Sequence, residues 1–70
     1  MMPLIMANTG EENVIRKVGG SPEMKKYLED LGFVPGSAVT VLNVIGGNLI
    51  VKVKESRMAI SKEMAVKIMV

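Results

Sequence analysis

The residues that could do chemistry in this chain are lysines, arginines, carboxylates and serines, because it contains no histidine and no cysteine. Transition metals in proteins are usually held by imidazole or thiolate ligands. The adjacent carboxylates are Glu11-Glu12 and Glu29-Asp30, and neighbours along a helix or a strand point in different directions. We therefore predict solvated surface charges, with no metal site and no bound cofactor.

A serine nucleophile needs a neighbouring base, and without histidine only a neutral lysine could serve. Ser61 and Lys62 are adjacent, but Ser61 has a complete explanation as the cap of a helical turn. Gly19-Gly20-Ser21 precedes a helix and could offer backbone N–H groups to an anion, yet it lacks the glycine and lysine pattern of a phosphate-binding loop. Capping is the favoured interpretation of both serines, and no catalytic residue and no enzymatic activity are predicted.

Three basic residues could build a charged sheet face, since residues i and i+2 of a strand share a side. They are Lys52, Lys54 and Arg57. A small nucleic-acid-binding barrel is therefore the alternative function. Barrels that bind single strands add exposed aromatic groups for base stacking, and here Tyr27 and Phe33 are better explained by helix packing and capping. We favour a solvated strand face that protects a sheet edge, and predict no nucleic-acid partner.

Length and composition favour one small β-rich domain over residues 1–70. The chain is 49% hydrophobic but has one tyrosine, one phenylalanine and no tryptophan, so its core must be aliphatic. Such a composition is typical of a small barrel. The apolar stretch from Met1 to Ala7 contains Pro3 and has no basic residue before it, so neither a signal peptide nor a membrane span is predicted. A cytoplasmic location is the expectation, and a mean hydropathy of +0.33 hints at a protein-binding surface.

One short helix is predicted after Gly20. Ser21 is a good N-cap, and Pro22 suits the first helical position. The helix is expected to end at Leu31, where Gly32 takes a left-handed conformation and Phe33 folds back onto Leu28 in a Schellman cap. Apolar residues at helical spacing define one buried stripe. These are Met24, Tyr27, Leu28 and Leu31.

Pro35-Gly36 predicts a type II turn, after which the pattern becomes extended. Alternation and turn signals predict about five strands. Their expected ranges are 12–18, 38–44, 49–54, 57–60 and 66–70. Residues 12–18 are expected to alternate with Val14 and Val18 on one face, and residues 38–44 to be covered on both faces.

The connections between the later strands are also predicted. Gly46-Gly47-Asn48 is a hairpin signal, and Glu55-Ser56 is expected to form the next turn. Residues 61–65 are expected to form a single helical or 3-10 turn before a last strand in which Val66, Ile68 and Val70 close the barrel. The predicted fold is mainly β, a small barrel of about five strands with one short α-helix.

The run Leu28-x-x-Leu31-Gly32-Phe33-x-Pro35-Gly36-x-x-Val39 resembles the signature of the FeoA family of small SH3-like barrels. Further pieces follow in the family's order. They are Thr9-Gly10-Glu11, Gly19-Gly20, Met58-Ala59-Ile60 and Ala65-Val66-Lys67-Ile68-Met69-Val70. The chain departs from the family at Tyr27, where relatives often carry a basic residue, and at the shorter connection Ile45-Gly46-Gly47-Asn48.

This resemblance implies a cytoplasmic, non-enzymatic accessory protein of ferrous iron uptake that docks onto the membrane GTPase FeoB. The related SH3-like domain of iron-dependent repressors implies a second binding role. Residues off the predicted stripe of the helix and in the turn after it are the hypothetical partner surface. They are Lys25, Lys26, Glu29, Val34 and Pro35.

Overall fold

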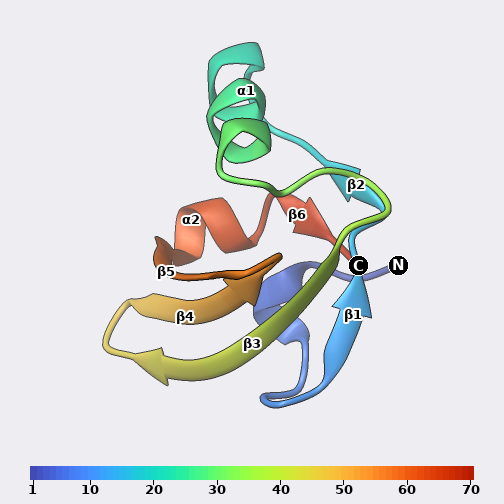
Figure 1. Cartoon of the computed structure of the whole chain (residues 1–70). Coiled ribbons are helices and arrows are strands. Elements are labelled where there is room, and N and C mark those ends of the chain that lie inside the picture. The colour runs from blue at the N-terminus through green and yellow to red at the C-terminus, as the bar shows by residue number, and fades with distance from the viewer.

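The computed structural model describes all residues from 1 to 70 and is built mainly of antiparallel strands. Four strands form one sheet in the order β1-β3-β4-β5, and β2 pairs with β6 in a second sheet (Figure 1). The elements in chain order are η1 (Leu4–Met6), β1 (Glu12–Val14), β2 (Lys17–Val18), α1 (Pro22–Asp30), β3 (Ala38–Ile45), β4 (Asn48–Val53), β5 (Ser56–Ser61), α2 (Lys62–Ala65) and β6 (Ile68–Met69). The predicted fold class, a small SH3-like barrel, is confirmed.

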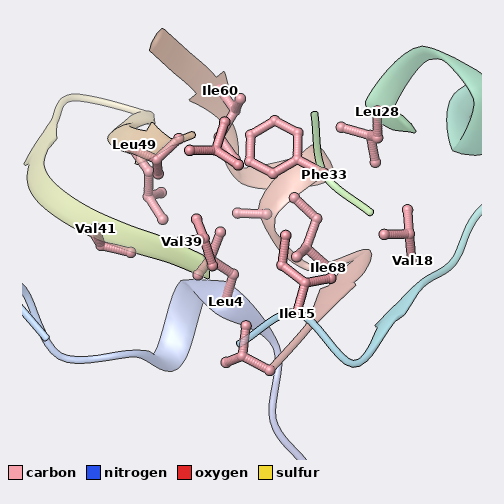
Figure 2. Packing of buried hydrophobic residues seen from close by; sticks show 14 residues of the cluster. Leu4, Ile15, Val18, Leu28, Phe33, Val39, Val41, Leu49, Ile60 and Ile68 are labelled. Atoms are coloured by element: carbon pink, nitrogen blue, oxygen red, sulfur yellow. The ribbon is translucent and has the colours of Figure 1, made fainter. Parts of the chain in front are cut away.

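The core consists of 14 buried hydrophobic residues and holds no buried polar side chain. Phe33 is the largest fully buried side chain. Figure 2 shows its ring beside Ile60 of β5, in the cluster that Leu28 of α1 and Ile68 of β6 also enter. Phe33, three residues after the end of α1, thus joins the helix to both sheets.

The caps of α1 are those that the sequence predicts. The Ser21 hydroxyl accepts a hydrogen bond from the Met24 N–H at 3.2 Å. At the other end Gly32 has a φ of +107°. The Phe33 N–H donates to the Leu28 carbonyl at 3.0 Å, and the Gly32 N–H donates to the Glu29 carbonyl at 2.9 Å. These two bonds constitute a Schellman motif.

The turn after the helix is anchored to the first half of the chain. The Ser37 N–H donates to the Val34 carbonyl at 3.1 Å, and Gly36 has a φ of +93°, as a type II turn requires. The Gly36 N–H donates to the Ile15 carbonyl at 2.8 Å, and the Ile15 N–H donates to the Ser37 carbonyl at 2.9 Å. The turn is therefore fixed in place between the two sheets.

The single strand predicted over residues 12–18 is wrong, because the chain changes sheets in its middle. β1 pairs with β3, whereas β2 pairs with β6. The change of direction buries Ile15 and leaves Val14 52% exposed. Val14 and Val18 therefore do not share a face, although each lies in a strand.

The prediction that both faces of residues 38–44 are covered is also wrong. Val39 and Val41 are buried, but Val44 and Ile45 are 52% and 60% exposed. The register between β3 and β4 shifts between Val41 and Asn43, and such a bulge bends the strand. The end of β3 consequently extends past the hydrophobic core, and its side chains are exposed to solvent.

Both hairpins of the large sheet are tight. Gly46-Gly47 joins β3 to β4, with Gly46 at a φ of +58°, and the predicted inward set of β4, Leu49, Val51 and Val53, is buried. The next turn is Lys54-Glu55, one residue earlier than predicted, because Val53 pairs with Ser56. Lys54 is the one non-glycine residue with a positive φ, 55°.

The last part of the chain matches prediction except that the closing strand, predicted over residues 66–70, is β6 at Ile68–Met69. Ser61 caps α2 by accepting a hydrogen bond from the Met64 N–H at 3.2 Å, and Ile68 and Val70 are buried. Val66 is 43% exposed, because it is the helical C-cap of α2 and not part of the closing strand.

The two ends of the chain pair with each other. The Met2 N–H donates to the Val70 carbonyl at 2.9 Å, and the Val70 N–H donates to the Met2 carbonyl at 2.8 Å. Pro3 forms a bridge with Met69. This pairing carries η1 into the core, where Leu4 is fully buried. The sequence analysis assigned no element to this segment.

Candidate partner-binding surface

The five residues of the hypothetical partner surface lie on α1 and on the turn after it. We call them the α1 surface: Lys25, Lys26, Glu29, Val34 and Pro35. The three helical residues and Pro35 are exposed, while Val34 is half-buried. Figure 1 shows α1 at one end of the molecule, away from the β3-β4 hairpin. The fold therefore leaves this surface open to another molecule.

Tyr27 adjoins the α1 surface, contrary to its prediction as part of the buried stripe. Its side chain is 54% exposed, whereas Leu28 is fully buried. Residues one position apart on a helix are about 100° apart around its axis. Tyr27 therefore lies at the edge of the strip that the barrel covers. An exposed aromatic residue beside charged groups is a frequent anchor in protein interfaces.

The motif residues that carry the family resemblance have structural roles. Leu28 and Phe33 are fully buried, Leu31 is half-buried beside them, and Gly32 supplies the left-handed residue of the helix cap. With Ser21 at the start of α1 and Pro35-Gly36 in the turn, they position the α1 surface. The motif residues thus hold the α1 surface in position and contribute few reactive groups themselves.

A second group of charges lies on the outer face of the large sheet. The strand register places Glu12 opposite Thr40, Thr40 opposite Lys52, and Lys52 opposite Arg57. Beside this row is a surface hollow of about 380 Å³. It is lined by Glu12, Ser37, Ala38, Thr40, Lys52 and Lys54. The sequence analysis named the three basic residues but placed no hollow there.

The potential metal ligands of the structure are scattered. The structure holds no group of three or more histidine, cysteine, aspartate or glutamate residues that could bind a metal ion. The hydroxyls of Ser21 and Ser61 are both occupied as helix caps. No helix of the structure is long and apolar enough to cross a membrane. What the geometry provides is two exposed, charged surfaces on a small barrel.

The sheet order, the helix inserted between β2 and β3, and the helical turn before the last strand define an SH3-like barrel. The family model of the FeoA domain matches residues 2–70. The chain belongs to the FeoA family, whose members are linked to ferrous iron transport.

Individual relatives agree with this assignment. The chain is 34% identical over 70 residues to a protein of Methanocaldococcus jannaschii provisionally named Fe(2+) transport protein A. This match covers all of this chain and 85% of the relative. The crystal structure of Stenotrophomonas maltophilia FeoA with zinc, described as a prokaryotic SH3 domain protein, has a TM-score of 0.85 at 25% identity. The match covers 99% of this chain and 88% of that one.

A second solved structure shows how widely the fold is used. A manganese-dependent transcriptional repressor has a TM-score of 0.85 at 19% identity, and the match covers 94% of this chain but 38% of the repressor. At this identity the likeness shows the fold alone. The same barrel therefore also occurs as one part of a longer protein.

Proposed function

We propose that this chain is a cytoplasmic, non-enzymatic accessory protein of ferrous iron uptake, and that it acts by docking onto a FeoB-type membrane GTPase. Family membership supports the link to iron uptake. The partner follows from the family resemblance. Docking, and not catalysis, is the mode of action that fits a rigid barrel whose serines and carboxylates form no reactive group.

The observation that carries the docking mode is the composition of the α1 surface and its neighbour Tyr27. Lys25, Lys26 and Glu29 are exposed charges, and Tyr27 is an exposed aromatic group on the same helix. Well-packed interfaces combine aromatic anchors with a polar rim. The Schellman cap fixes the helix end, so little order has to be gained on binding.

A double variant tests this proposal. Lys26→Glu with Val34→Asp reverses one charge and places a carboxylate on the apolar part of the α1 surface. We expect it to weaken capture of the purified cytoplasmic domain of the transporter by about tenfold or more, since a reversed charge and a buried acid both oppose docking. The measurement is a pull-down followed by calorimetric titration.

The chain offers a matched control on another face. Lys62→Glu with Val44→Asp makes the same two chemical changes near the β3-β4 hairpin, where Val44 is 52% exposed and the Lys62 N–H donates to the Gly47 carbonyl. This control is expected to bind like the parent protein. The proposal fails if the α1 variant remains folded by circular dichroism and binds with undiminished affinity, or if the control loses as much.

A further inference from the structure

The outer face of the large sheet has a charge pattern that the α1 surface does not explain. The row Glu12, Thr40, Lys52 and Arg57 crosses all four strands. Side chains alternate across a strand, and the neighbouring residues Val51 and Val53 are buried. Lys52 and Arg57 are therefore directed to solvent, where both are exposed.

The hollow beside this row is rich in hydrogen-bond donors. Of its six lining residues only Ala38 is hydrophobic. Lys52 and Lys54 contribute ammonium groups with three N–H donors each, and Ser37 and Thr40 contribute hydroxyls. The lining thus carries two positive charges, on Lys52 and Lys54, and one negative charge, on Glu12. Arg57 adds a third positive charge next to Lys52. The complementary ligand is an anionic group that accepts several hydrogen bonds.

Two turns of the fold hold the hollow in shape. Lys54 has a left-handed backbone, with a φ of 55°, which is costly for a residue with a side chain. Its Cδ and Cε atoms lie 3.7 and 3.8 Å from the place where a Cβ on Gly32 would be. The stem of Lys54 therefore packs over the end of α1. Ser37, on the other side, is the last residue of the Pro35-Gly36 turn.

We propose that this hollow binds an acidic segment of a protein partner. Aspartate or glutamate carboxylates of the segment pair with Lys52 and Lys54 and accept hydrogen bonds from Ser37 and Thr40, while Arg57 receives the next acidic residue. Charge complementarity carries the choice of occupant. A single-stranded nucleic acid is disfavoured, because the lining of the hollow contains no aromatic group for base stacking.

This proposal goes beyond docking through the α1 surface, because it concerns a different face and does not depend on which protein carries the acidic segment. Its test is an NMR titration of the complete chain with an acetylated hexapeptide in which glutamate and serine alternate. The backbone amide signals of Ser37, Thr40, Lys52 and Lys54 are expected to shift with saturation in the millimolar range or below. The same peptide with glutamine in place of glutamate is expected to cause no shift.

Charge-reversal variants then show which residues bind the peptide. Lys52→Glu is expected to weaken the peptide's affinity by about tenfold, since an attraction becomes a repulsion. Lys62→Glu is the matched control, because Lys62 is an exposed lysine at the start of α2 and does not line the hollow. It should leave the affinity unchanged. Arg57→Gln provides a second, milder variant, expected to weaken binding in the same direction.

Three results with the peptide would overturn the proposal. They are the absence of any shift at millimolar peptide, shifts confined to another face, and an equal loss in the Lys62→Glu control. A hexamer of deoxythymidine that binds the same residues more tightly than the peptide would also overturn it, in favour of nucleic acid. None of these outcomes affects the pull-down that tests docking through the α1 surface.

Discussion

Gly32 joins the helix cap to the sheet, and its replacement by alanine gives a sharp test of that role. A Cβ at this position would lie 3.7 Å from Lys54 Cδ and 3.8 Å from Val53 Cγ1. These are ordinary van der Waals distances, so the substitution causes no collision. The cost must come from the backbone, because φ is +107°.

A left-handed backbone costs a residue with a side chain about 1–2 kcal/mol. If the chain instead relaxes to negative φ, it loses the bonds that Gly32 and Phe33 donate to the last turn of α1. For a domain of this size each kcal/mol lowers the melting temperature by about 4–8 °C. We therefore expect Gly32→Ala to melt about 4–16 °C below the parent. Gly32→Val should lose at least as much.

The assay is thermal unfolding followed by circular dichroism, with urea unfolding at fixed temperature as a second measure. Two further variants separate the cost of backbone strain from the cost of side-chain contacts. Gly36 has a φ of +93° and open space around its Cβ position, so Gly36→Ala should lose a similar amount. Gly47 has equally open space and no positive φ, so Gly47→Ala should melt close to the parent. A Gly32→Ala protein that melts like the parent would refute the reasoning.

Three further predictions concern the core, an exposed position on α1 and metal binding. Phe33→Ala removes the largest buried side chain and should cost about 3–5 kcal/mol, comparable with the whole stability of a domain this small, so urea unfolding should show it largely unfolded. Tyr27→Ala, at an exposed position, should stay within about 0.5 kcal/mol of the parent. In calorimetric titration with ferrous iron, we expect no stoichiometric site of micromolar affinity, since the structure gathers no three potential ligands.

The local parts of the fold were predictable because their causes lie within a few residues. The caps of α1, the turn at Pro35-Gly36 and the alternation of β4 each follow from short-range steric and hydrogen-bonding rules. The division of residues 12–18 was not predictable. It depends on pairing with β3 on one side and β6 on the other, and these partners lie more than twenty residues away.

The candidate surfaces were likewise predictable only in part. The exposure of Lys25, Lys26 and Glu29 follows from helical periodicity, whereas that of Tyr27 depends on how wide a strip of α1 the barrel covers. For the hollow, strand alternation predicted Lys52 and Lys54 on one side, although Lys54 lies in the turn after β4. Only the register with β3 brings Thr40 opposite Lys52, and no sequence pattern specified that register.

The pairing of Met2 with Val70 has a consequence for how this barrel can be combined with other chains. Met2 and the last residue, Val70, exchange both backbone hydrogen bonds, so their Cα atoms lie about 5.5 Å apart. A host polypeptide that enters at one end of the barrel therefore leaves close to the other. The barrel is thus geometrically suited to insertion into a surface loop of a larger protein, with its core intact and no long linker. Cutting the chain at Gly46-Gly47 and joining the old ends should likewise yield a circular permutant that folds.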